Sequence, residues 1–278
     1  MTDNSTSVAT RANPAEVTRK PGPRVPNFAI SIIIAVLAIA VAESVAAQGW
    51  VSELVLPAPS AVWQALVDGF ARGVYWRHIA STAGTAVGGF IIASIVAILV
   101  AGIMASIQRL EHVLVPFIYA FQCLPKIAVA PLVILAVGFG QESKVVIVVI
   151  STFFPIFVNT LQGLRVRDRT QYELFQSLGA SKFQQFRLLK LPASLPYVFA
   201  GLHIGVILSL IGAIVAEFVG SPLGLGYYMT QQRSQFNVPA VYAVLLVLMV
   251  LGMLFHGAVT LLEKRLAFWA GDVGNVSI

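Results

Sequence analysis

Long apolar runs separated by short polar stretches dominate the chain. Six of them reach the length of about twenty mainly apolar residues that a membrane-spanning helix needs. They cover residues 28–47, 79–107, 113–139, 145–164, 192–219 and 239–262. The pattern predicts an all-α membrane protein whose six transmembrane helices occupy residues 28–269. An even number of spans places both ends of the chain on the same side of the membrane.

Polar tails flank this region. Residues 1–27 are rich in Thr, Ser, Asn and Pro, and they lack the short apolar core and the cleavage site of a signal peptide. A segment this polar cannot bury enough apolar surface to fold by itself. We expect a disordered cytoplasmic tail at 1–27 and a short cytoplasmic tail at 270–278.

Composition and charge agree with a membrane location. Of 278 residues, 58% are hydrophobic and 11% are charged, too few charges to cover a soluble domain of this size. The formal net charge of +6 suits either nucleic-acid binding or orientation in the bilayer. With the amino terminus inside, thirteen basic residues lie in cytoplasmic segments, four lie outside, and Lys126 falls within a span. This asymmetry favours orientation, so we expect no nucleic-acid partner.

The sequence contains no arrangement typical of catalysis. Cys123 is the only cysteine, so neither an internal disulfide nor a cysteine metal cluster can form. The sequence also lacks a Walker phosphate loop, an H-E-x-x-H motif and a close pair of carboxylates within a span. We expect no enzymatic activity, no metal and no cofactor in this chain.

The loop at 165–191 is the most ordered polar segment. Tyr172, Phe175 and Leu178 recur at helical spacing, and Gly179 suits the left-handed residue that ends a helix. Ser181 can cap a second helix, predicted over 182–190. The pattern predicts a helix, a sharp turn and a helix that dock another protein. The alternative is an amphipathic helix that lies on anionic lipid.

The same loop carries a family resemblance. Its sequence ELFQSLGASKFQQFRLLKLP matches the pattern E-A-A, three residues, G, nine residues, I-x-L-P at Glu173, Gly179, Leu191 and Pro192, with Leu189 in the isoleucine position. It resembles the coupling loop of ABC importer permeases. The segments LPKIAVAPLVILAVGFG and FFPIFVNTLQGL, and Ala216-Glu217 with Gly224-Leu225-Gly226, resemble the nitrate, sulfonate and taurine group of this MetI-like, binding-protein-dependent family.

This resemblance implies a type I ABC importer fold with cytoplasmic coupling helices, in a bacterial plasma (inner) membrane. Two copies, expected to be identical, would form the pathway. Cytoplasmic ATPase subunits would bind ATP and Mg, and an external substrate-binding protein would deliver a small solute. Sulfonates, nitrate and aromatic carboxylates are the implied anions, with vitamin precursors as the alternative. The residues implied in ATPase coupling are Glu173, Phe175, Leu178, Gly179, Ala180, Leu191 and Pro192.

Polar residues inside the spans are candidates for the translocation pathway, because ionisable groups are costly there. They are Lys126, Asn159, His203, Ser209 and Glu217. Lys126 could hold an anion, extend to the headgroups or pair with a carboxylate. Glu217 could line a gate, pair helices or stand exposed at the mouth. Hydrogen bonding between helices is the usual role of the other three residue types. Three prolines, Pro116, Pro125 and Pro131, predict that the third span is irregular and borders the pathway.

Two outer connections also carry patterns. An amphipathic helix capped by Ser60 is predicted to brace the first span, with Trp63, Tyr75 and Trp76 at the membrane interface. The loop at 220–238 is the better candidate for receiving a binding protein. An ion-coupled secondary transporter remains the alternative class, although such a protein is expected to show internal repeats and the six spans show no clear one.

Overall fold

The computed structural model describes residues 27–107, 113, 115–118, 120–121, 124–165 and 169–269. Both predicted tails lie outside the described residues, apart from Asn27. Within the described ranges every regular element is helical. The helices are α1 (Asn27–Ala47), α2 (Pro59–Ala71), α3 (Val74–Ser106), α5 (Lys126–Val137), α6 (Gln141–Arg165), α7 (Arg169–Ser177), α8 (Lys182–Gln185), α9 (Leu191–Gly220), α10 (Leu225–Ser234) and α11 (Val238–Leu266), with a π-helical turn, Phe186–Lys190, between α8 and α9.

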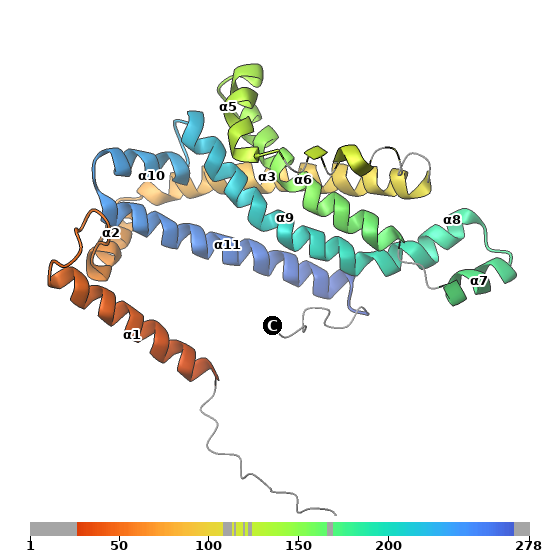
Figure 1. The fold of residues 1–278 in the computed structure, drawn as a ribbon, viewed down its shortest axis with the longest axis horizontal. Coiled ribbons are helices and arrows are strands. Elements are labelled where there is room, and N and C mark those ends of the chain that lie inside the picture. The colour runs from red at the N-terminus through yellow and green to blue at the C-terminus, as the bar shows by residue number, and fades with distance from the viewer. Residues whose placement is uncertain are drawn as a thin grey trace, which may run out of the picture.

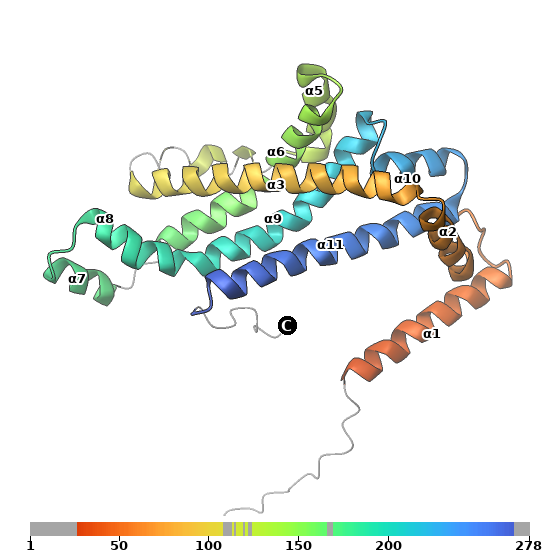
Figure 2. The ribbon, with the colours of Figure 1, turned by 180° about the vertical axis from the view of Figure 1, so that it is seen from behind.

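Four long helices form the body of the structure. Helix α6 packs between α3 and α9, and α11 packs against α9 (Figure 1). Helices α2 and α10 lie at one end of this bundle and α7 and α8 at the opposite end, as Figure 2 shows from behind. We call these the α2–α10 end and the α7–α8 end. Five described helical segments are long and apolar enough to cross a membrane, namely 30–47, 74–106, 141–165, 182–220 and 238–266.

Small residues let the central helices approach closely. A methyl group added at Gly201 of α9 would come within 3.0 Å of the Ile156 Cα atom of α6. Gly89 of α3 likewise faces Val148 of α6, since an added methyl group there would come within 2.4 Å of the Val148 side chain.

The predicted third span is not one continuous helix. Residues 124 and 125 are not helical, and α5 begins only at Lys126, with Pro125 as its N-cap residue. Proline lacks the backbone donor that would continue a helix, and it disfavours helical geometry at the preceding residue. Helix α5 has 12 residues and packs against α6 and α9, where buried Ala130 and Ile134 contact Ile147 and Ala216. Pro131, in contrast, lies inside the helix.

Helix α2 confirms the predicted outer helix but not its predicted cap. The N-cap residue is Ala58, and no side chain caps the helix in the usual way. Instead, the carboxylate of Glu43 in α1 accepts hydrogen bonds from the Ser60 backbone N–H at 3.0 Å and the Ser60 hydroxyl at 2.7 Å. A negative charge is favourable at a helix N-terminus. The contact therefore joins α1 to α2, as a brace of the first span requires.

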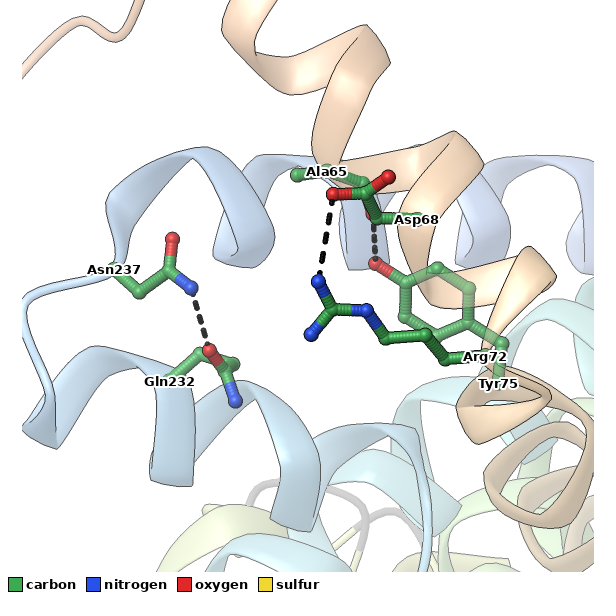
Figure 3. A network of polar contacts seen from close by, with 6 residues as sticks. All are labelled: Ala65, Asp68, Arg72, Tyr75, Gln232 and Asn237. Atoms are coloured by element: carbon green, nitrogen blue, oxygen red, sulfur yellow. Dashed lines mark hydrogen bonds and ion pairs between the residues drawn. The ribbon is translucent and has the colours of Figure 1, made fainter.

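Tyr75 was predicted at the membrane interface, and this prediction is wrong. Its side chain is fully buried, and its hydroxyl donates to the Ala65 carbonyl at 3.3 Å (Figure 3). Gly69 leaves room for the ring, because an added methyl group there would come within 2.1 Å of it. Trp63 and Trp76 are exposed, in agreement with an interfacial position.

Candidate functional site

The predicted turn after α7 is present, with the expected glycine. Gly179 has a φ of +70°. Its N–H donates to the Gln176 carbonyl at 2.9 Å, and the Ala180 N–H donates to the Phe175 carbonyl at 3.0 Å. These two bonds form a Schellman motif, which satisfies the last carbonyl groups of a helix and requires a left-handed residue at the glycine position. The chain therefore reverses sharply between α7 and α8.

Ser181 caps α8 as predicted. Its hydroxyl accepts the Gln184 backbone N–H at 3.3 Å, while its own backbone N–H donates to the Gln184 side-chain oxygen at 2.7 Å. This reciprocal pair is a capping box, which satisfies two donors at the start of the helix. Gln185 donates to the Ala180 carbonyl at 3.0 Å and is buried. The turn between α7 and α8 is thus held from both sides.

The second helix was predicted to end at residue 190, and this prediction is wrong. Residues Lys182–Gly220 form one helical segment of 39 residues, which passes from α8 through the π-helical turn into α9. Pro192 is the second residue of α9 and follows the π-helical turn directly, so its missing backbone donor interrupts the hydrogen bonding of the continuous helix at this point. The wider π-helical turn adjusts the helix just before this proline. The loop and the membrane helix are therefore continuous in secondary structure, with a change of direction between α8 and α9 (Figures 1 and 2).

Apolar side chains of this loop are exposed. Leu178 is 73% exposed and Phe183 is 70% exposed, although they flank the rigid turn. Leu174 and Leu188 are also exposed. The remaining predicted coupling residues divide between exposed positions (Glu173, Gly179 and Leu191) and half-buried ones (Phe175, Ala180 and Pro192). Large apolar groups held outward on a fixed turn form a surface suited to contact with another protein.

A buried carboxylate organises the opposite end of the bundle. Glu217 is 1% exposed, and its carboxylate accepts the Thr82 hydroxyl of α3 at 2.8 Å and the Gly226 N–H of α10 at 2.7 Å. The Thr82 hydroxyl also accepts the Leu225 N–H at 2.8 Å. One acidic group thus links α3 and α9 and supplies the N-terminal cap of α10. A buried charge needs such partners, because its desolvation is costly.

The loop between α9 and α10 folds directly over this carboxylate. Gly224 has a φ of +133°, and an added methyl group would lie 2.0 Å from the Glu217 carboxyl carbon. The Gly224 N–H donates to His78 Nδ1 of α3 at 3.1 Å. Burial raises the pKa of the nearby Tyr228 phenol, which stays neutral and packs its ring 5.1 Å from that of His78. Glycine is required here by both conformation and space.

Lys144 joins the same region, although it lies one residue before the predicted span 145–164. Helix α6 begins at Gln141, so Lys144 lies in its first turn and is only 5% exposed. Its ammonium group donates to the Ser221 hydroxyl at 3.1 Å. The sequence did carry a signal for the burial of Lys144. This residue lies one position before an apolar run, at helical spacing from Ile147 and Val148.

Residues 89–268 match the family described as binding-protein-dependent transport system inner membrane component. The chain belongs to this family. It is a multi-pass membrane protein and the permease subunit of an ABC importer, a class of subunit that is not itself catalytic. A secondary transporter is thereby excluded.

Several relatives share most of the permease. The formylaminopyrimidine transport permease protein ThiX of Halalkalibacterium halodurans is 36% identical over 77% of this chain and 85% of its own length. The riboflavin transport system permease protein RibX of Chloroflexus aurantiacus is 35% identical over 77% of this chain and 80% of its own. The putative aliphatic sulfonates transport permease protein SsuC of Bacillus subtilis is 29% identical over 93% of this chain and 94% of its own length.

The fold agrees with a solved permease. A chain of the methionine ABC transporter MetNI, in an inward-facing conformation, superposes with a TM-score of 0.56 and 21% sequence identity. The match covers 70% of this chain and 95% of that one. The permease therefore has a MetI-like fold.

Two predicted pathway residues of the permease satisfy their polar groups locally. The Asn159 side-chain amide donates to the Pro155 carbonyl of its own helix at 2.8 Å. Ser209 is fully buried, and its hydroxyl donates to the Val206 carbonyl at 2.8 Å. Each contact lies within the residue's own helix, α6 for Asn159 and α9 for Ser209, and neither joins two helices. A pathway role for either residue stays a prediction.

His203 links two helices near the α7–α8 end. Its Nε2 atom lies 2.8 Å from a Glu263 carboxylate oxygen of α11, and its ring centroid lies 4.6 Å from that of His256. This is the hydrogen bonding between helices expected of polar residues in membrane bundles. The side chain of Lys126 lies outside what the structure describes, so its role stays a prediction.

We predict that Thr82→Val destabilises the permease. Valine keeps the shape of threonine but leaves a Glu217 oxygen and the Leu225 N–H without their partner, which costs about 1–3 kcal/mol. The apparent Tm of the purified transporter should fall. Thr152→Val is the matched control, because the Thr152 hydroxyl is buried and has no hydrogen-bond partner among the described residues. Equal Tm values for the two variants would contradict a stabilising role for the Thr82 hydroxyl.

Proposed function

We propose that this permease receives the ATP-driven movement of its ATPase subunits through the loop formed by α7 and α8. The carrying observation is the turn at Gly179, held by a Schellman motif on one side and a capping box on the other, with exposed Leu178 and Phe183 beside it. A rigid apolar surface can transmit a push, whereas a flexible loop would absorb it. ATP and Mg would be bound by the ATPase subunits.

The continuous helix Lys182–Gly220 supports a mechanical route through the membrane. Helix α9 alone has 30 residues, roughly 45 Å at 1.5 Å per residue, which is enough to cross a bilayer. One end of the segment is the docking loop, and the other carries Glu217 and the loop that folds over it. A displacement of α8 would therefore tilt α9 against α6 and act on the α2–α10 end. Alternating access by rocking of helices follows from this arrangement.

We further propose that the α7–α8 end faces the cytoplasm, that both chain termini lie on that side, and that the membrane is a bacterial inner membrane. In support, the described basic residues at the α7–α8 end include Arg165, Lys182, Arg187, Lys264 and Arg265. The bias of Lys and Arg toward the cytoplasm orients most membrane proteins. Residues 113–139 would supply the remaining span, giving six in all.

The proposed assembly contains two identical copies of this chain, two ATPase subunits and a substrate-binding protein on the outer side. The proposed solute is small, with an anion as the first candidate and a vitamin precursor as the alternative. The names of the relatives include an anion class and vitamin-related compounds, since they mention aliphatic sulfonates, riboflavin and formylaminopyrimidine. We assign most of the specificity to the binding protein.

The docking proposal predicts the behaviour of two variants at one position. Gly179→Val forces a β-branched residue into a left-handed conformation, so it should distort the turn and lower solute uptake tenfold or more. Gly179→Asn should retain most uptake, because asparagine tolerates this conformation. Uptake and copurification of the ATPase are measured together. Normal uptake and copurification with valine would show that the turn is not required.

The orientation predicts which side of the membrane each end occupies. With Cys123 replaced by serine, Ser181→Cys should react with an impermeant maleimide only in opened cells. Ser234→Cys should react in intact cells with a permeable outer barrier. Both serines are exposed, so access within the protein does not limit labelling. The opposite pattern would reverse the topology and remove the cytoplasmic docking surface.

An anion-holding role for Lys126 predicts a dependence on charge. Lys126→Met should retain assembly and basal ATPase activity but lose solute uptake, while Lys126→Arg should keep part of it. Uptake is measured in reconstituted vesicles with the binding protein present. Normal uptake by the methionine variant would leave extension to the headgroups, or a structural pairing, as the role of this lysine.

A further inference from the structure

The turn between α10 and α11 contains a strained aromatic residue. Among the described residues, Phe236 is the one non-glycine residue with a positive φ, at 55°. Its N–H donates to the Arg233 carbonyl at 3.1 Å, and the Asn237 N–H donates to the Gln232 carbonyl at 3.0 Å. These are the bonds of a second Schellman motif, in which Phe236 stands where Gly179 stands after α7. A left-handed conformation costs a non-glycine residue about 1–2 kcal/mol.

Burial does not offset this cost, because the Phe236 side chain is 74% exposed. The turn is nevertheless held firmly. The Asn237 side-chain amide donates to the side-chain oxygen of buried Gln232 at 2.8 Å, as Figure 3 shows. The Asn237 side chain also accepts the Ala240 N–H at 3.4 Å, which caps α11. The aromatic ring is therefore held outward on a turn with little freedom, at a position where glycine would be less strained.

The residues near Phe236 in the α10–α11 turn are polar and exposed. They are Gln231, Arg233, Ser234, Gln235 and Asn237. An aromatic ring inserted in lipid is expected among apolar neighbours. The polar pattern therefore favours a position of the Phe236 ring in water. Beside the turn lies a hollow of about 170 Å³ between α9, α10 and α11, lined by Phe218, Met229, Thr230, Arg233 and Val241. An aromatic group within a polar rim is the usual composition of a protein-binding hot spot.

This surface lies at the α2–α10 end, opposite the proposed ATPase surface (Figure 1). We propose that Phe236 is the aromatic anchor through which the permease receives its substrate-binding protein. The inference rests on the proposed function. The partner surface is expected to offer an apolar pocket for the ring, bordered by acidic or hydrogen-bonding groups that face Arg233. The firmly held turn lowers the entropy lost when the two proteins dock.

The test uses the complete transporter in lipid nanodiscs, with its ATPase subunits, titrated with its solute-loaded binding protein. Phe236→Gly removes the ring and relieves the backbone strain, so the fold and the basal ATPase rate should be retained. The binding-protein concentration for half-maximal ATPase stimulation should rise about tenfold or more. Phe236→Tyr should stay within about threefold of the unchanged protein, since it keeps the ring. Gln48→Ala, exposed in the connection between α1 and α2 and outside this polar rim, is the control and should change nothing.

A second readout uses photo-crosslinking. A benzophenone amino acid at position 236 should crosslink to the binding protein, whereas the same group at Phe268, exposed at the opposite end, should not. An unchanged half-maximal concentration in Phe236→Gly would overturn the inference, and a basal rate that then varied with lipid composition would indicate a lipid contact instead. Loss of basal activity in Phe236→Gly would also overturn it, in favour of a structural role. If the binding protein did not stimulate the unchanged transporter, the proposed function itself would fail, and the inference with it.

Discussion

The backbone groups at helix ends must find hydrogen-bond partners, and in this permease that requirement organises both functional surfaces. The first turn of α10 is satisfied by the buried carboxylate of Glu217, and that of α2 by Glu43 of α1. Helix α8 has its own capping box. Each cap also fixes the direction in which the chain leaves a helix, so capping decides where the exposed side chains of the loops point.

The carboxylate of Glu217 shows how one cap can join several elements. It links α3, α9 and α10, and Gly224 lets the loop approach it closely. A helix terminus, a neighbouring hydroxyl and the nearby positive charge of Lys144 together make a buried charge tolerable. The α2–α10 end is thus a connected unit. Any movement of α9 must carry this unit along or break its hydrogen bonds.

The two Schellman turns illustrate how similar backbone geometry can serve different surfaces. After α7 the left-handed position is occupied by Gly179, which allows a strain-free reversal between α7 and α8. After α10 it is occupied by Phe236, whose backbone is strained and whose ring is exposed. In both places the turn is rigid, and rigid turns suit surfaces that must transmit or receive a force. The helix Lys182–Gly220 connects the two ends of the bundle.

Local patterns in the sequence determined the helices, the turn at Gly179 and the cap at Ser181, because these depend on hydrophobic periodicity and on residues within a few positions of each other. The family followed from the motif of the same loop. The break before Lys126 was only partly foreseen, since a proline can either kink or end a helix. Burial of Tyr75, the capping of α2 by Glu43 and the partners of Glu217 were decided only by the tertiary structure. A polar residue in an apolar run must find a partner, but the sequence does not say which distant helix will bring that partner within hydrogen-bond distance.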